Sequence, residues 1–286
     1  MKKITVLLVF LLLFLMTGCQ KIFDEAAGVK SEPKIIVSGS STVYRIIKAA
    51  ADEYMENNPK SAKFVIKESN STEGINSVNS GDADIGLMSR EITPEERAYG
   101  LVETKIGYDG IAVILHPDNP VKSLKLDALK RILTGEISNW SEVKNGDDRP
   151  VTVVSRQPGS GIKSVLESTL NLIDFDKKSM ISAKATVVNT TDEMIDTVSE
   201  NPGAIGFVPM LSADDDKPTH VPLINNIPCT RQTVSEKLYP LRMTFYTVHR
   251  GSASDEVKAF VNFLVSETGQ RIVWEQGAVR AVEPAA

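Results

Sequence analysis

Cysteine, histidine and tryptophan are scarce in this chain of 286 residues, which has two cysteines, three histidines and two tryptophans. No group of cysteines and histidines has the spacing of a metal site. The histidines His116, His220 and His249 are the only candidates for the base of a serine hydrolase. None lies in a Gly-x-Ser-x-Gly context or beside a suggestive partner. We therefore expect no catalytic residues, no metal and no other cofactor.

The chain also lacks an apolar run of the length of a permanent membrane-spanning helix, which needs about 20 residues. Lys2-Lys3 precedes a shorter run, Ile4–Met16, and Thr17-Gly18-Cys19 follows it. A basic start, a short apolar core and small residues are typical of an export signal, and a cysteine after glycine favours the bacterial lipoprotein type. We predict a signal peptide at 1–18, lipidation of Cys19 and a tether at 19–33. A plain secretory peptide is the alternative.

Basic residues are outnumbered, since 32 lysines and arginines stand against 37 aspartates and glutamates and give a net charge of −5. Nucleic-acid binding requires a basic face, so we expect no nucleic-acid partner. A small anionic ligand is not excluded, because its binding depends on local hydrogen-bond donors and not on the total charge.

What the sequence contains is a repeated order of short apolar strand, polar loop and amphipathic helix. Strands are predicted at 35–37, 63–67, 83–88, 111–115, 151–154, 203–208 and 241–248. Helices are predicted from 43 to about 57, at 75–78, from 93, at 126–133, at 162–172 and at 254–270. This order predicts parallel βαβ units and an α/β fold.

Four polar loops follow predicted strands, at Ser38–Thr42, Ser69–Glu73, Ser89-Arg90 and Arg156–Gly161. In open α/β sheets, ligands lie outside the carboxyl ends of the strands. Hydroxyl groups, the free N–H groups of helix starts and two guanidinium groups together suit a small oxyanion. The alternatives are ordinary helix caps without a ligand and surface ion pairs for the two arginines.

Seven motifs follow each other along the chain. They are Gly39–Tyr44, Ala83–Gly86, Ser89–Glu91, Tyr108–Val113, Leu133–Trp140, Arg156 with Gly159–Gly161, and Pro202–Gly206. In this order they resemble the phosphate-binding lipoprotein family of bacterial phosphate ABC importers, over about residues 34–275. The resemblance implies a two-lobed periplasmic-binding-protein fold of type II, with mixed sheets flanked by helices and a ligand cleft between the lobes. We expect residues 34–110 and 245–286 in lobe 1, and 111–244 in lobe 2.

By matching position, the resemblance implies ligand-binding roles for Ser41 or Thr42, with an ambiguity of one residue, and for Ser71, Arg90, Arg156, Ser160 and Gly161. We include Ser40, in the same loop as Ser41 and Thr42, among the expected ligand-binding residues. Two departures bear on selectivity. Ile162 stands where family members often have threonine. It therefore lacks the hydroxyl donor and can give the ligand only its backbone N–H. Arg90 stands where some members have a carboxylate that accepts the proton of hydrogen phosphate, which sulfate lacks. Asp109 is our candidate replacement, and the alternative is a turn aspartate before Gly110.

The predicted function is capture of inorganic phosphate by an extracytoplasmic solute-binding lipoprotein that delivers it to an ABC permease. The resemblance implies a protein anchored to a bacterial membrane through the lipid on Cys19, and we expect a monomer. The alternatives are a binding protein for another tetrahedral oxyanion such as sulfate or molybdate, a phosphate sensor or adhesion lobe, and, less favoured, a serine hydrolase.

Overall fold

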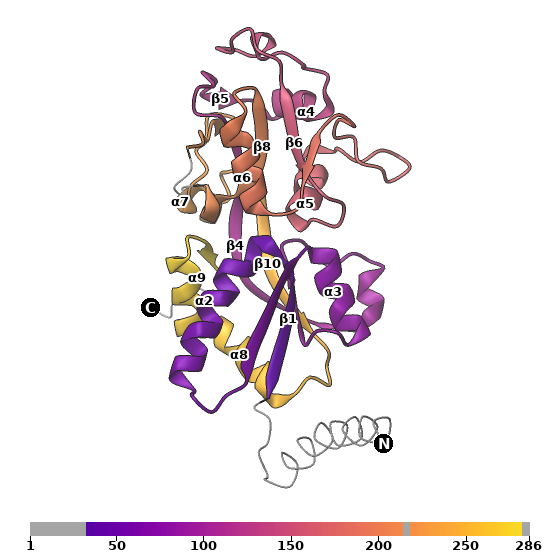
Figure 1. Cartoon of the computed structure of the whole chain (residues 1–286), viewed down its shortest axis with the longest axis vertical. Helices are drawn as coiled ribbons and strands as arrows, with labels where there is room; N and C mark the ends of the chain where they lie inside the picture. Colours follow the sequence, from indigo (N-terminus) through magenta and orange to yellow (C-terminus); the bar gives the residue numbers. More distant parts are fainter. Residues whose placement is uncertain (1–32, 214–217, 282–286) are drawn as a thin grey trace, which may run out of the picture.

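The computed structural model describes residues 33–213 and 218–281, which form two lobes stacked along the long axis (Figure 1). Lobe 1 contains β1 (Lys34–Ser40), α2 (Ser41–Asn57), β2 (Lys63–Ser69), α3 (Ser71–Ser80), β3 (Ile85–Met88), the 3-10 helix η1 (Glu96–Tyr99), β10 (Arg242–His249), α8 (Asp255–Val265), α9 (Glu267–Glu275) and β11 (Val279–Arg280). Lobe 2 contains β5 (Ser123–Leu124), α4 (Leu126–Thr134), η2 (Trp140–Glu142), β6 (Thr152–Arg156), α5 (Gly161–Leu170), β7 (Thr186–Val188), α6 (Thr191–Glu200), β8 (Ala204–Pro209), η3 (Met210–Ser212), β9 (Leu223–Ile224) and α7 (Arg231–Ser235). The predicted signal peptide and Cys19 lie outside the described residues.

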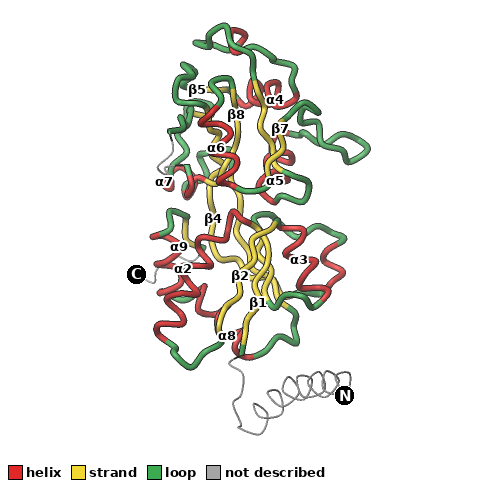
Figure 2. The backbone as a smooth tube through the Cα atoms, in the orientation of Figure 1, coloured by secondary structure: helices red, strands yellow, loops and turns green. Residues whose placement is uncertain are grey.

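One mixed sheet runs through both lobes in the order β2-β1-β3-β10-β4-β8-β6-β7 (Figure 2). Its shared strand is β4 (Val102–Leu115), which pairs antiparallel with β10 up to Gly110 and antiparallel with β8 from Ile111. The chain returns at Leu241, whose carbonyl accepts the N–H of Ile111 at 2.8 Å. The predicted α/β architecture with two lobes is confirmed. The exact division of the chain between the lobes stays a prediction.

Within each lobe the parallel pairs place strand ends and helix starts at the waist of the molecule. In lobe 1, β1 pairs parallel with β2 and β3, and in lobe 2, β6 pairs parallel with β7 and β8. The helix α2 buries Val43, Ile46 and Ile47 on one face, which fixes it on the sheet. Because β1 ends where α2 begins, the polar residues between them lie at the carboxyl edge of the sheet.

Three expectations for individual elements differ from the structure, and one long element was not expected. The helix predicted over 254–270 is two helices, because the Ser266 hydroxyl accepts the N–H of Gly269 and starts α9. The helix predicted from Thr93 is a single 3-10 turn, ended by Gly100 at φ 62°. The strand predicted at 111–115 begins at Val102, and α6 was not predicted. Within the described ranges, no helix is long and apolar enough to cross a bilayer.

Candidate functional site: an anion cleft between the lobes

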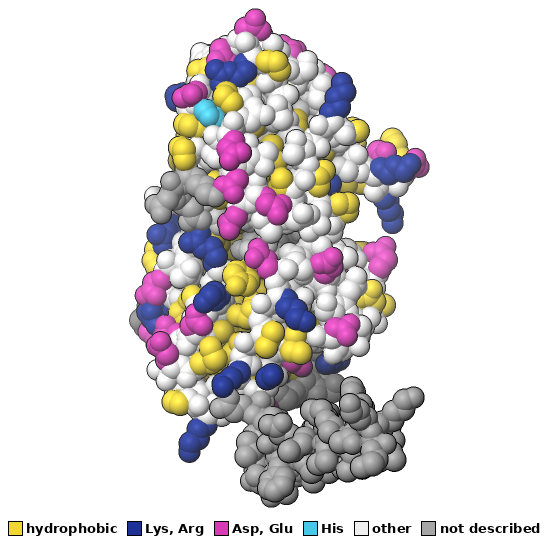
Figure 3. Space-filling view, in the orientation of Figure 1, with side chains coloured by type: hydrophobic (Ala, Val, Ile, Leu, Met, Phe, Trp, Pro, Cys, Tyr) yellow, Lys and Arg dark blue, Asp and Glu magenta, His cyan; other side chains and the backbone are white. Residues whose placement is uncertain are grey.

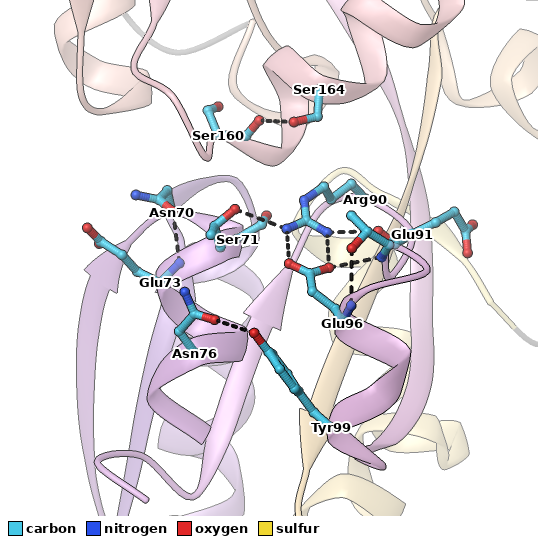
Figure 4. Close-up of polar contacts among 12 residues, drawn as sticks. Asn70, Ser71, Glu73, Asn76, Arg90, Glu91, Glu96, Tyr99, Ser160 and Ser164 are labelled. Carbon is cyan, nitrogen blue, oxygen red and sulfur yellow. Dashed lines mark hydrogen bonds and ion pairs between the residues drawn. The ribbon is translucent and has the colours of Figure 1, made fainter. Parts of the chain in front are cut away.

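Three helices begin at the waist, α2 and α3 in lobe 1 and α5 in lobe 2 (Figures 1 and 4). The lobes touch there, since the N–H of Thr72 donates to the carbonyl of Gly159 at 3.3 Å. Gly161, the first residue of α5, lies so close to the hydroxyls of Ser71 and Ser89 that a Cβ atom would overlap both. Helix starts from both lobes therefore face one small volume. Their partial positive charges suit an anion in that position.

A hydroxyl cluster of Ser40, Ser71 and Ser89 lines the lobe 1 side of this volume. Ser40 Oγ lies 3.0 Å from Ser89 Oγ, and Ser71 Oγ lies 3.4 Å from the same atom. Ser71 Oγ also accepts the N–H of Ser89 at 3.1 Å. Ser40 is 3% exposed, and Ser71 and Ser89 are fully buried. Hydroxyl groups can rotate to donate or accept, so the hydroxyl cluster can adapt to an oxyanion.

Arg156 enters the site from lobe 2, at the end of β6, and is 1% exposed. Its Nη2 donates to Ser41 Oγ of lobe 1 at 2.9 Å and to the carbonyl of Asn189 at 2.5 Å. Its Nε and Nη1 are buried without a hydrogen-bond partner. Burial lowers the pKa of Arg156 to about 10, so the group is still charged at neutral pH. Buried charged donors without partners are costly, and an anion would satisfy them.

The helix caps add an independent indication. Ser40 and Ser160 are the N-cap residues of α2 and α5, and neither side chain caps its helix. All other serine, threonine and asparagine N-caps of the described helices do accept a first-turn N–H, as Asn70 does for α3. The first-turn N–H groups of α2 and α5 thus lack a side-chain acceptor in the cleft. They are donors that an oxyanion can use.

Two carboxylates modulate the charge of Arg156. Glu68 at the end of β2 and Glu193 in α6 attract its guanidinium and partly offset the effect of burial on its pKa. Glu193 also accepts the N–H of Asn189 at 2.7 Å, which orients the carbonyl that holds Arg156. Acidic side chains gather over α6 on the outer face of lobe 2 (Figure 3). This face of lobe 2 therefore does not attract an anion, and we expect binding to depend on the donors inside the cleft.

Six of the predicted site residues meet in this cleft: Ser40, Ser41, Ser71, Arg156, Ser160 and Gly161. Thr42 is buried in the first turn of α2, next to them. Ser89 was not selected, although its loop was. The signal that identifies it is its position directly after the four buried residues of β3, which fixes it at the carboxyl edge of the sheet.

Arg90 is placed differently from the prediction. Its two terminal nitrogens donate to Glu96, to the Glu91 carbonyl and to Thr72 Oγ1 (Figure 4). A guanidinium whose terminal nitrogens are engaged in this way has little left to offer an anion. The geometry therefore does not support a direct ligand role for Arg90.

Asp109 is also placed differently. It is fully buried on β4, where its carboxylate accepts the N–H of Gly110 at 2.9 Å and of Leu211 at 3.4 Å. Among the hydrogen bonds of the described residues, none joins Asp109 to Arg156 or to the hydroxyl cluster. The structure thus favours the turn aspartate before Gly110, the alternative left open above, over an acceptor for the ligand's proton.

Comparisons with known proteins agree with this geometry. A profile of the PBP superfamily domain matches residues 24–268. The phosphate-binding protein PstS of Bacillus subtilis is 29% identical over 262 residues, 90% of this chain and 84% of that protein. A candidate phosphate ABC transporter substrate-binding protein of Clostridium perfringens, solved with bound phosphate, is 30% identical with a TM-score of 0.82, over 87% of this chain and all of that one. A phosphate transport receptor of Vibrio cholerae is 30% identical with a TM-score of 0.71, over 86% of this chain and 99% of that one. The chain therefore belongs to the PBP superfamily, and its predicted place in the family of phosphate-binding proteins of ABC importers is confirmed.

Proposed function

We propose that this protein captures inorganic phosphate in the cleft between its lobes and delivers it to an ABC importer. The relatives named for phosphate binding support the ligand and the transporter. The observation that carries the proposal is Arg156, whose buried Nε and Nη1 have no partner beside two helix starts without side-chain caps. A tetrahedral anion of charge −2 accepts hydrogen bonds from both kinds of donor.

The residues that would hold phosphate come from both lobes. Ser40, Ser41, Thr42, Ser71 and Ser89 supply hydroxyl groups and first-turn N–H groups from lobe 1. Arg156, Ser160 and Gly161 supply the charge and the α5 helix start from lobe 2. Because both lobes contribute, ligand binding and lobe closure are linked. Binding without chemistry is the whole function in this proposal, so the protein is a carrier and not an enzyme.

Calorimetric titration with phosphate, sulfate, arsenate and molybdate tests the ligand. We expect one site per chain, with phosphate and its close analogue arsenate bound far more tightly than sulfate or molybdate. Preference for sulfate or molybdate would assign the protein to another oxyanion. Incubation with a phosphate ester provides the enzymatic control, and turnover would contradict a pure binding role.

We further propose that the protein acts outside the cytoplasm, that a lipid on Cys19 anchors it to the membrane, and that it is a monomer. Cys19→Ser should move the protein from the membrane fraction to the medium or periplasm and abolish incorporation of labelled palmitate. Light scattering of the protein without its lipid should give the mass of one chain. Unchanged membrane association of Cys19→Ser would contradict the anchor, and a dimer mass would contradict the monomer.

A further inference from the structure

Arg90 lies beside the cleft and is held on several sides (Figure 4). Its Nη1 donates to Glu96 Oε2 at 2.7 Å and to the carbonyl of Glu91 at 2.9 Å. Its Nη2 donates to Glu96 Oε1 at 2.7 Å and to Thr72 Oγ1 at 3.0 Å. Arg90 is 7% exposed and Glu96 8%. The planar fork of the guanidinium thus meets the carboxylate with two parallel bonds, which fixes the orientation of both groups.

The carboxylate of Glu96 is itself fixed. Its Oε2 accepts the N–H of Thr93 at 2.9 Å, and the Glu96 N–H donates to Thr93 Oγ1 at 3.2 Å. Burial alone raises the pKa of Glu96, but the hydrogen bonds from Arg90 and Thr93 outweigh burial and hold it below its usual range. The ion pair is therefore formed at neutral pH and carries no net charge. A neutral pair adds little long-range attraction for an anion.

The ion pair touches two of the three segments that carry the hydroxyl cluster, the start of α3 and the end of β3. Thr72 follows Ser71 in the first turn of α3, and Arg90 itself follows Ser89. The Thr72 N–H donates to the Gly159 carbonyl of lobe 2 at 3.3 Å. One residue, Thr72, is thereby bound through its side chain to Arg90 and through its backbone to the opposite lobe.

We propose that Arg90 is a positioning residue, which together with Glu96 holds Ser71, Thr72 and Ser89 in the geometry that phosphate requires. It acts through these residues and makes no contact with the anion. Without it, the first turn of α3 and the end of β3 lose their common anchor, and the hydroxyl cluster loses its alignment with α5. The proposal rests on the phosphate-binding function proposed above.

A double-mutant cycle tests this role with phosphate titrations of Arg90→Gln, Glu96→Gln and the double variant. We expect each single variant to bind phosphate about tenfold more weakly, and the double variant to be no worse than either, since losing one partner already frees the other. An anion contact by Arg90 predicts a loss of about 30-fold or more in Arg90→Gln and little effect in Glu96→Gln. That outcome would overturn the proposal. Arg97→Gln, an exposed arginine of η1, is the matched control.

Salt dependence and a conservative variant separate positioning from charge. The slope of log Kd against log salt should be the same in wild type and in the double variant Arg90→Gln/Glu96→Gln, because a neutral pair is replaced by two neutral side chains. Arg90→Lys keeps the charge but loses the two-bond fork, so it should bind as weakly as Arg90→Gln. A reduced slope in the double variant, or wild-type affinity in Arg90→Lys, would overturn the proposal.

Thermal unfolding of each variant shows whether it is folded at the titration temperature. Should Arg90→Gln not be folded, Arg90→Lys and Glu96→Gln carry the test. Wild-type protein that does not bind phosphate overturns the proposed function. Wild-type protein that binds, with Glu96→Gln unaffected, overturns only the positioning role.

Discussion

Two arginines, Arg156 at the end of β6 and Arg90 just after β3, have opposite surroundings in this protein. Arg90 meets the carboxylate of Glu96 within its own lobe, whereas Arg156 reaches across to Ser41 and keeps two buried nitrogens without a partner. The first guanidinium is neutralised and structural, and the second remains available to a ligand. At this scale, the neighbours of a charged side chain decide its role.

Arg156→Ala should weaken phosphate binding by about 30-fold or more, because truncating one member of a buried charged contact typically costs 2–5 kcal/mol. Calorimetric titration measures the change. Arg131→Ala, which removes an exposed arginine paired with Glu136 on lobe 2, should bind like wild type. Binding within about threefold of wild type in Arg156→Ala would contradict the assignment.

Asp109→Asn should change the pH dependence of stability. Burial raises the pKa of Asp109 well above its usual value, and the N–H groups of Leu211 and Gly110 only partly oppose this. The folded protein therefore holds this proton to higher pH than the unfolded chain. The protonated Asp109 carboxyl group therefore contributes fully to stability below the pKa of an unfolded aspartate, about 3.9. This contribution is lost as the pH rises through the pKa of Asp109 in the folded protein.

Asparagine does not titrate, so the free energy of unfolding of Asp109→Asn relative to wild type should increase as pH rises from about 4 towards the raised pKa of the folded protein. Urea unfolding at several pH values measures it, and a constant difference would contradict the raised pKa. The ratio of phosphate to sulfate affinity should stay that of wild type, because the Asp109 carboxyl group accepts the N–H groups of Gly110 and Leu211 and bonds to none of the donors in the cleft. A smaller ratio of phosphate to sulfate affinity in Asp109→Asn than in wild type would instead support Asp109 as the acceptor of the ligand's proton.

At the scale of elements, the start of α5 is where lobe 2 packs against the hydroxyl cluster of lobe 1. Its first residue, Gly161, packs against Ser71 and Ser89, and the preceding Gly159 has φ 84° and packs against Asn70. A glycine is needed at Gly161 because there is no room for a side chain between the lobes. The helix start can therefore approach the hydroxyl cluster directly.

Gly161→Ala should weaken phosphate binding by at least about tenfold, which equals 1.4 kcal/mol, because the added methyl group keeps the lobes apart. The melting temperature without phosphate should be nearly unchanged, since an opened cleft has room for the methyl group. Gly251→Ala is the matched control, because nothing lies within 4 Å of a Cβ there. Equal phosphate affinity in the two variants would show that α5 does not close on lobe 1 in this way.

At the scale of the whole molecule, two backbone passages join the lobes, one within β4 and one at Leu241. A further contact between the lobes joins α7 and α9. Arg231 donates to the carbonyl of Trp274 at 2.9 Å, and its guanidinium lies 4.2 Å from the centre of the Trp274 ring. Two lobes that are joined by few backbone passages and that contact each other through polar groups can rotate about a hinge.

Phosphate should reduce the radius of gyration, because the anion bridges donors from both lobes and favours the closed form. Small-angle scattering with and without saturating phosphate measures this, and Arg156→Ala is the control that should not respond. Tryptophan fluorescence gives a second readout, since Trp274 is 43% exposed at the lobe contact and Trp140 is fully buried. Identical radii with and without phosphate would contradict closure.

How much the sequence predicts is clear from particular elements. Local apolar patterns predict β1, β2, α2, α4 and β8 close to their observed bounds, since each forms from neighbours in the chain. The first half of β4 was missed because its polar residues at Glu103, Thr104 and Lys105 become a strand only by pairing with β10. The break at Ser266 depends on a single cap bond, which periodicity does not register.

The sequence by itself determined the α/β class, the polar loops at strand ends and the family, because strand, loop and helix signals are local and the motifs are ordered along the chain. Only the tertiary structure decided that Arg90 meets Glu96 in its own lobe and that Arg156 reaches Ser41 of the other lobe. Glu96 and Ser41 lie 6 and 115 residues from the arginines they bind. The contact between Arg156 and Ser41 at the waist depends on how the two lobes meet. Local residue patterns carry no information about the distance between residues of different lobes.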